Sequence, residues 1–370
     1  NTYNVAPSIS PNGNQIAILS NKSGPMAYYL ISAEDGRVIE KIIQGERSAE
    51  YEELHLLKPG ITWSPDSKKI AFSAKSGKSD ALFIYDTELE KSKRFRLGLE
   101  GIFRPSWSPK GDKIAFIGND GKYGDVYLFD VKSHEIVNLT SDWYSEDQVS
   151  WAPNGDELYF TSDRGEILTI GEIQIPHNYD VKQTDIYSIK INTKEITQLS
   201  DTPWNETYPT MSGDGEYLAF ISDESGISNI MMMHNGEINP ITNVSTGITQ
   251  LSWNWDDSQL IFTGFYKSGY DIFTLSNPKS KIKLNINVPK AAWVDDIKSS
   301  QRLLRKSEEG GQHRQFGTEY KNYVFAGIDA SEEFEDSQVV EMEDNQTQEN
   351  GIYKSNIYST RFTLDNAQAV

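Results

Sequence analysis

Apolar and polar positions alternate in short runs along most of the chain, and these runs recur in the same order. Residues 105–120, "PSWSPKGDKIAFIGND", show the unit: a short apolar run, a polar turn with Pro and Gly, and a second alternating run. Apolar residues at every second position predict half-buried β-strands, and Pro with Gly between them predicts a tight turn. Each unit therefore predicts the start of an antiparallel sheet.

The unit occurs six times. The copies are "PSISPNGNQIAILSN" from Pro7, "ITWSPDSKKIAFSAK" from Ile61, "PSWSPKGDKIAFIGN" from Pro105, "VSWAPNGDELYFTSD" from Val149, "PTMSGDGEYLAFISD" from Pro209 and "LSWNWDDSQLIFTGF" from Leu251. The position of Ser108 recurs at steps of 54, 44, 44, 60 and 42 residues. A period in the forties is typical of propeller blades, whose four-stranded sheets pack face to face.

The third unit shows all four strands in turn: "PSW", "KIAFIG", "DVYLFDV" and "IVNLT". Its apolar side chains are expected to face the two neighbouring blades; they are Ile114, Phe116, Val126, Leu128, Ile136 and Leu139. The recurring acids of the turn, such as Asp66 and Asp214, are interpreted as structural. The prediction is an all-β, six-bladed propeller of four-stranded antiparallel blades over residues 1–290, with blades starting near residues 7, 61, 105, 149, 209 and 251.

Two long steps come from insertions. In "GERSAEYEELHLLKPG", residues 45–60, Tyr51, Leu54 and Leu57 are spaced to share one face of a short helix before Pro59. The second insertion, residues 164–183, is predicted to form an extended hairpin. Insertions at loops cost little free energy and often carry function.

Residues 291–370 form a C-terminal extension without the repeat. "AAWVDDIKSSQRLLRK" predicts an amphipathic helix over 291–306, and residues 331–350 hold eight acids and no base, which predicts an acidic linker. Residues 353–370 are expected to be extended. Because the chain begins at Asn1 without Met, we expect it to be a portion of a longer protein.

The repeated phrase, followed by an I-Y-x-x-D strand and a closing L-T, resembles the TolB-type six-bladed propeller repeats of bacterial envelope proteins over residues 7–288. Met211, Gly213 and "WNWDDS" depart from the phrase but keep the turn plausible. The resemblance implies a location in the periplasm or cell envelope of a bacterium. Such propellers serve as docking modules and as domains appended to peptidases. The lead-in "ELHLLKPG" and the C-terminal tail resemble parts of large bacterial surface proteins, which implies fusion to a peptidase or membrane barrel domain outside this stretch.

Charge and composition narrow the class of partner. Lys and Arg number 35 against 54 Asp and Glu, and the net charge of −19 disfavours nucleic acid and anionic lipid while favouring a partner of basic character. No apolar run approaches the ~18 residues of a membrane span, so no membrane insertion by this stretch is expected. The expected partner is a protein or peptide.

Familiar catalytic and metal motifs are missing from the sequence. There is no Cys, no G-x-S-x-G, no H-E-x-x-H and no phosphate-binding glycine pattern, so no cofactor is predicted. The Asp-rich turns "NDGKYGD" and "SDESGIS" offer oxygen ligands for Ca²⁺ but lack the alternation of an EF-hand loop, so a structural turn is the favoured interpretation. Ca²⁺ stays open as the alternative.

The best binding candidates lie in loops that lead into the inner strands, because propeller symmetry places these loops on one face. They are "EGIFRP", "SDWYSEDQ" and "SDTPWNETYP". The candidate partner-binding residues are Phe103, Arg104, Trp143, Tyr144, Glu146, Asp147, Trp204, Glu206 and Tyr208. The aromatic side chains have an alternative role as lids on the blade junctions.

Three functions remain open. The first is a non-catalytic envelope docking module that binds a protein or peptide at the channel mouth. The second is an accessory propeller domain of a larger peptidase-type or outer-membrane protein. The third is a propeller enzyme that acts on carbohydrate through carboxylates such as Glu146, Asp147 and Glu206, which must stand ~5–9.5 Å apart.

Overall fold

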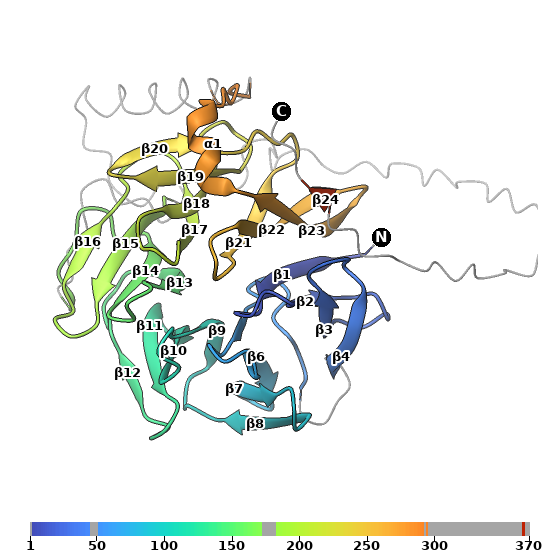
Figure 1. Cartoon of the computed structure of the whole chain (residues 1–370). Coiled ribbons are helices and arrows are strands. Elements are labelled where there is room, and N and C mark those ends of the chain that lie inside the picture. The colour runs from blue at the N-terminus through green and yellow to red at the C-terminus, as the bar shows by residue number, and fades with distance from the viewer. Residues whose placement is uncertain (1, 45–50, 172–182, 292–293, 295–364, 367–370) are drawn as a thin grey trace, which may run out of the picture. The chain divides into compact units, whose positions relative to one another are not determined.

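Six four-stranded sheets follow one another around a ring (Figure 1). The computed structural model describes residues 2–44, 51–171, 183–291, 294 and 365–366. Within each sheet the strands lie side by side in chain order, and in blades one to five all four strands form an antiparallel meander. The predicted six-bladed all-β propeller is confirmed.

The first three blades are formed by the N-terminal half of the chain. Blade one contains β1 (Asn4–Ile9), β2 (Gln15–Ser20), β3 (Ala27–Ser32) and β4 (Val38–Gln44). Blade two contains β5 (Ile61–Trp63), β6 (Lys69–Ser76), β7 (Ser79–Asp86) and β8 (Lys91–Phe95). Blade three contains β9 (Gly101–Trp107), β10 (Lys113–Asn119), β11 (Gly124–Asp130) and β12 (Ile136–Asn138).

The other three blades complete the ring. Blade four contains β13 (Glu146–Trp151), β14 (Glu157–Ser162), β15 (Asp185–Lys190) and β16 (Ile196–Gln198). Blade five contains β17 (Glu206–Met211), β18 (Leu218–Ser222), β19 (Asn229–His234) and β20 (Glu237–Pro240). Blade six contains β21 (Ile248–Trp253), β22 (Gln259–Tyr266), β23 (Gly269–Ser276) and the two-residue β24 (Asp365–Asn366), which pairs parallel to β23.

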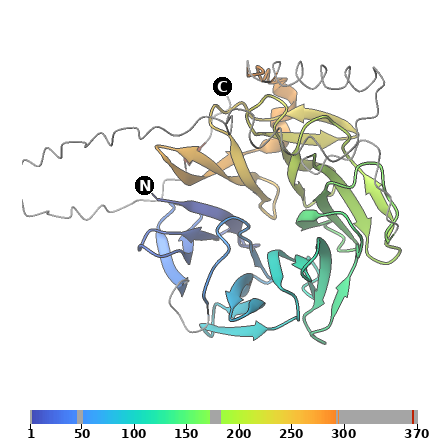
Figure 2. The ribbon, with the colours of Figure 1, turned by 180° about the vertical axis from the view of Figure 1, so that it is seen from behind.

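Blades one and six meet without a covalent link between them. Both views place β1 beside the last blade (Figures 1 and 2). Tyr3 and Tyr270 form a parallel β-bridge, and the side-chain amide of Asn4 donates to Asp271 Oδ1 over 3.1 Å. Backbone pairing and side-chain contacts therefore close the ring.

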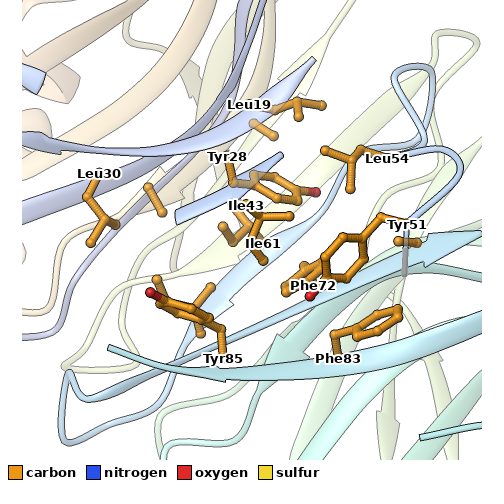
Figure 3. Close-up of a cluster of buried hydrophobic side chains, with 14 of the residues drawn as sticks. Leu19, Tyr28, Leu30, Ile43, Tyr51, Leu54, Ile61, Phe72, Phe83 and Tyr85 are labelled. Atoms are coloured by element: carbon orange, nitrogen blue, oxygen red, sulfur yellow. The ribbon is translucent and has the colours of Figure 1, made fainter. Parts of the chain in front are cut away.

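Each of the six blade junctions contains its own cluster of buried apolar side chains. Between blades one and two, Phe72 and Phe83 stack at 5.2 Å, and the ring of Tyr51 lies 4.8 Å from Phe83 (Figure 3). Blade three shows why one sheet serves two junctions: Phe116 packs toward blade two, whereas its neighbours in sequence, Ala115 and Ile117, pack toward blade four. The period-2 alternation of a strand produces both faces.

The recurring polar turn is held by its own side chains. Ser64 Oγ donates to Asp66 Oδ1 over 2.5 Å, and Asp66 accepts from the backbone N–H of Lys68 over 3.1 Å. Ser212 and Asp214 repeat the hydroxyl–carboxylate bond at 2.6 Å. These acids are therefore turn residues, in agreement with the structural interpretation of the repeat.

The expected helix in the first insertion is wrong for the part of it that is described. Residues 51–60 contain no helix; Glu53 instead forms an antiparallel bridge with Lys75. Tyr51 and Leu54 are buried in the first junction, but Leu57 is 92% exposed, so the three do not share a buried face. Because β5 is only three residues long, the insertion supplies the pairing that the rest of β6 needs.

A short helix that was not predicted follows the last repeat. It consists of α1 (Pro278–Lys281) and the 3₁₀ turn η1 (Ile282–Leu284). Except for Ala291 and Val294, the helix predicted over 291–306 lies outside the described residues, as does the acidic linker. Of the predicted extended tail, only β24 is described.

Candidate functional site

Five of the six inner strands contain a β-bulge at the same place. In blades one, three, four, five and six the pairing with the second strand shifts register there. One residue of each bulge has a positive φ between 44° and 59°; these residues are Ala6, Arg104, Gln148, Tyr208 and Gln250. A bulge kinks its strand and re-aims a side chain, and non-glycine residues with positive φ are uncommon. Because it recurs at the same place in five blades, the bulge is a regular element of this fold.

The bulges surround a central channel. Together with Gly60 of blade two, the five bulge residues form what we call the channel ring, and all six line a cavity of about 180 Å³. Gly60 stands beside Arg104, and a Cβ on Gly60 would overlap the backbone of Arg104. Glycine is therefore required at this close approach.

A second layer of the channel carries hydroxyl groups. Two residues after each member of the channel ring comes a Ser or Thr that also lines the cavity: Ser8, Thr62, Ser106, Ser150, Thr210 and Ser252. We call these residues the hydroxyl ring. Ser150 Oγ donates to the carbonyl of Pro209 over 2.7 Å, and Thr62 Oγ1 accepts from the backbone N–H of Trp107 over 3.1 Å. Hydroxyls both donate and accept hydrogen bonds, so the remaining capacity of this layer can serve the backbone of an incoming chain.

Three tryptophans of the repeat hold residues of the hydroxyl ring in place from the next blade, whereas Trp107 donates to Gly111 of its own turn. The indole Nε1–H of Trp63 donates to the carbonyl of Ser8 over 2.9 Å, and that of Trp151 donates to the carbonyl of Ser106 over 2.8 Å. Trp253 donates to the carbonyl of Thr210 over 3.1 Å. Since the indole is otherwise apolar and buried, one side chain both fills a junction and ties two inner strands together.

Two glutamines connect neighbouring blades at the channel. Gln250 Oε1 accepts from the backbone N–H of Ala6 over 2.6 Å and from the hydroxyl of Thr263 over 2.8 Å. Gln148 Oε1 accepts from the hydroxyl of Thr161 over 2.7 Å and from the backbone N–H of Tyr208 over 3.4 Å. These bonds fix the relative positions of the inner strands at the cavity.

Arg104 is the only charged residue among the described residues that line the channel. Its Nε lies 3.1 Å from Asp147 Oδ1, and its guanidinium carbon lies 4.9 Å from the centre of the Tyr208 ring. The side chain is 11% exposed. Neither Nε nor Nη1 has a hydrogen-bond partner within the part of the chain that the structure describes, because the contact with Asp147 lacks hydrogen-bond alignment.

The candidate residues do not all converge on this opening. Arg104 and Tyr208 line the channel, and Asp147 is paired with Arg104. The half-buried Phe103 lies to the side, its ring 5.0 Å from that of His55. Tyr144, Glu146 and Glu206 are buried in blade junctions, so the expected contact of these three with a partner does not fit their positions.

The two candidate tryptophans lie apart from the channel cavity. Trp143 is half-buried and lines a separate pocket with Asp120 and Tyr123. Trp204 is half-buried beneath Lys290, whose Nζ lies 5.5 Å from the centre of the indole. The loops share a face by symmetry, but the side chains point to different places because each loop has its own conformation.

Comparison with known proteins agrees with this architecture. The TolB beta propeller domain family matches residues 49–179. TolB from Acinetobacter baumannii superimposes with a TM-score of 0.54 at 19% identity, covering 72% of this chain and 62% of that one. TolB from Agrobacterium tumefaciens gives 0.51 at 18% identity, covering 64% and 79% of the two chains. The repeats within residues 49–179 match the TolB type.

Other comparisons limit what this likeness carries. The tricorn protease contains a similar region, with a TM-score of 0.54 at 15% identity, covering 78% of this chain but only 27% of the protease. No curated protein sequence matches the chain. At these identities the likeness to solved structures shows the fold alone. The binding partner has to be inferred from the geometry of the channel.

The structure describes no helix that has both the length and the apolar character needed to cross a membrane. The Asp-rich turns of the TolB-type propeller use their oxygens within the protein. Asn119 Oδ1 accepts from the backbone N–H of Gly121 over 2.6 Å, and Asp223 accepts from Asn205 over 2.9 and 3.0 Å. These bonds are consistent with a structural role for the turns, and Ca²⁺ binding there stays a prediction.

A buried ionic cluster lies between blades three and four. Carboxylate oxygens of Asp125, Asp142 and Glu146 all lie within 4.8 Å of one another. The fully buried Arg164 is ion-paired with Asp142 Oδ2 at 3.2 Å and with Glu146, and it donates to Ser162. Burial raises the pKa of Glu146 to about 8, although Arg164 acts in the opposite direction. The guanidinium thus supplies the cation that this acidic cluster needs.

A carboxyl pair occupies the corresponding place one blade later. Glu206 is 1% exposed and accepts from the hydroxyl of Thr202 over 2.6 Å. Burial raises the pKa of Glu206 to about 8 and that of the neighbouring Asp185 to about 6. Here no arginine is ion-paired with the pair among the described residues. One shared proton is the simplest way to keep both acids buried.

This pair predicts a pH dependence of stability. The pKa of Glu206 is higher in the folded chain than the ordinary value of 4.5, so the folded state holds more protons between these pH values. The contribution of Glu206 to the free energy of unfolding should therefore be fully present below about pH 4.5 and be lost as the pH rises toward about 8. The free energy of unfolding should thus decrease with pH over this range. We expect Glu206→Gln to make this decrease smaller by ~0.5–1 kcal/mol per pH unit, as measured by urea unfolding at a series of pH values. The exposed Glu88→Gln serves as control; equal slopes in the two variants would contradict the assignment.

Sequence reasoning missed the channel residues Gln148 and Gln250 and the whole hydroxyl ring. A signal for the hydroxyl ring was present in the aligned repeats, where a Ser or Thr recurs in "PSI", "ITW", "PSW", "VSW", "PTM" and "LSW". The channel ring had no such signal, because its five bulge residues share a positive φ and no side-chain type.

Proposed function

We propose that this protein is a non-catalytic docking module of the bacterial cell envelope that binds an extended segment of another protein or a peptide in its central channel. The observation that carries the proposal is the channel ring. Its symmetry-related bulges bring a cation, an aromatic ring and two amides to one opening above six hydroxyl residues. Tyr and Arg are the residue types enriched at energetic centres of protein interfaces.

The size of the channel favours an extended segment as the occupant. A cavity of about 180 Å³ is smaller than the ~300–1,000 Å³ of sites for drug-sized ligands. A helix with its side chains is ~10–12 Å across and needs much more room. A single extended chain end suits this volume better, with the hydroxyl groups that are not bonded within the protein facing its backbone groups.

The positions of the acids do not favour carbohydrate cleavage. Acid–base cleavage needs two carboxyl groups that reach the same glycosidic bond. Glu146 and Glu206 are 2% and 1% exposed and lie in different blade junctions, while Asp147 is paired with Arg104. Binding is therefore the function that the channel supports best.

A second candidate is an accessory propeller within a larger protein of peptidase type. The observation in its favour is the likeness of the tricorn protease, of which the matching region is 27%. In that setting the same channel guides an extended substrate chain. Both candidates predict occupation of the channel, and they differ in what the rest of the protein does.

Random peptide libraries test the proposal. One library displays peptides with a free C-terminus and the other displays them with the C-terminus fused to the carrier. We expect enriched peptides whose affinity falls ~10-fold or more in Tyr208→Ala, the scale of an interface hot spot. Trp255→Ala, which removes a 48% exposed aromatic ring outside the channel, is the matched control. Enrichment only of peptides that bind both variants equally would overturn the proposal, provided that melting curves show both variants folded.

A further inference from the structure

Arg104 stands in an unusual electrostatic position. The chain carries a net charge of −19, yet the one charged residue among the described lining of its channel is a cation. Its side chain is 11% exposed, so the guanidinium has lost most of its contact with water. A buried guanidinium that is incompletely hydrogen-bonded costs free energy unless a partner completes its bonding.

The protein's own contacts use one part of the guanidinium. Asp147 lies at the Nε side at 3.1 Å, and the Tyr208 ring lies 4.9 Å from the guanidinium carbon. Nη1 is buried without a hydrogen-bond partner in the described part of the chain. Arginine has five N–H donors in a planar fork, a geometry that matches a carboxylate.

The described surroundings of Arg104 in the channel suit such a group electrostatically. The remaining members of the channel ring are uncharged, and the one acid in contact with Arg104, Asp147, lies outside the ring. The hydroxyl of Ser106 lies two residues further along the same strand and lines the same cavity.

We propose that Arg104 is a carboxylate-binding residue and that the segment bound in the channel presents a carboxylate to its Nη edge. The inference rests on the proposed docking function and specifies the chemistry of the occupant. A carboxylate at the end of a chain enters a narrow channel more readily than one in mid-chain, because only one strand of backbone has to fit. The acidic exterior remains suited to basic residues that follow outside the channel.

The test uses peptides enriched from the library with free C-termini. Each is synthesised as the free acid, as the C-terminal amide and with its Asp and Glu changed to Asn and Gln, so that the source of the carboxylate is distinguished. We expect one of these neutralisations to weaken binding by ~10- to 100-fold, the scale of a charge-assisted hydrogen bond. In Arg104→Gln the same neutralisation should have less than about a 2-fold effect, whereas the exposed Arg37→Gln should behave like the parent protein.

Two outcomes separate this inference from the proposed function. If binding depends on Tyr208 but every neutralisation changes affinity by less than about 2-fold, or by the same factor in Arg104→Gln, the carboxylate site is wrong and the docking function stands. If no peptide binds in a Tyr208-dependent manner, the docking function itself is wrong.

A second measurement needs no peptide. Titration with acetate should shift the Nε–H resonance of Arg104 in side-chain NMR spectra, while acetamide should leave it unchanged. A shift no larger than that of Arg37 would overturn the carboxylate site.

Discussion

Replacing Arg164 with methionine is expected to lower the free energy of unfolding by about 3–5 kcal/mol, the usual cost of removing one partner of a buried ion pair. The variant leaves Asp142 and Glu146 buried without their cation, beside Asp125. The methionine also loses the guanidinium contacts with the rings of Tyr144 and Phe160, at 5.3 and 5.7 Å. Urea unfolding at pH 7 measures the effect.

Arg37→Met is the control for this experiment, since Arg37 is 78% exposed and its contact with Asp35 is 3.8 Å long. An exposed ion pair of this kind is worth ~0–1 kcal/mol. Adding Glu146→Gln to Arg164→Met should recover part of the loss, because it replaces one of the two buried carboxyl groups that have lost the guanidinium with a neutral amide. A loss below ~1 kcal/mol for Arg164→Met would show that the cluster is not held by this cation.

The second large effect is expected at the tryptophan between blades three and four. Trp151→Ala should lower the free energy of unfolding by ~3–5 kcal/mol, because it opens a cavity in a junction that contains Val149, Leu158 and Phe160. It also leaves the carbonyl of Ser106 without the indole donor. Thermal and denaturant unfolding both report this change.

Trp151→Phe separates the two contributions. Phenylalanine keeps an aromatic ring in the junction but cannot donate to Ser106, so we expect a smaller loss of ~1–3 kcal/mol. The difference between the two variants measures packing, and the loss in the phenylalanine variant measures mainly the hydrogen bond between blades. Equal losses in both would mean that the ring contributes little and that the hydrogen bond dominates.

The fold was predictable because six copies of one phrase agree with one another. Each copy repeats strand, turn and strand with the same spacing, so a local misinterpretation in one blade is corrected by the other five. The prediction failed at residues 51–60 for a physical reason. Tyr51, Leu54 and Leu57 have helical spacing, but β5 pairs with only three residues of β6, and Glu53 forms a β-bridge with the unpaired part of that edge. Tertiary pairing overrode the local pattern.

The candidate site was predictable only in part. Arg104 and Tyr208 were found because they belong to aromatic segments that lead into the repeated phrase. These segments were expected to be loops, but the structure places both residues at bulges within the inner strands β9 and β17. Glu146 was misassigned because its partner Arg164 is 18 residues away, on the far side of the second strand, and no sequence pattern connects the two. The positive φ of the five bulge residues had no sequence signal, since Ala, Arg, Gln and Tyr are not residues that mark such a conformation.

Photochemical crosslinking from the channel tests the central claim most directly. Benzoylphenylalanine replaces Tyr208 in one variant and Leu89, which is 68% exposed on the turn between β7 and β8, in the other. Each variant is irradiated with a selected peptide, and the covalent adducts are quantified by mass spectrometry. Docking in the channel predicts an adduct from position 208 and none above background from position 89. Equal yields from both positions, or an adduct from position 89 alone, would contradict it.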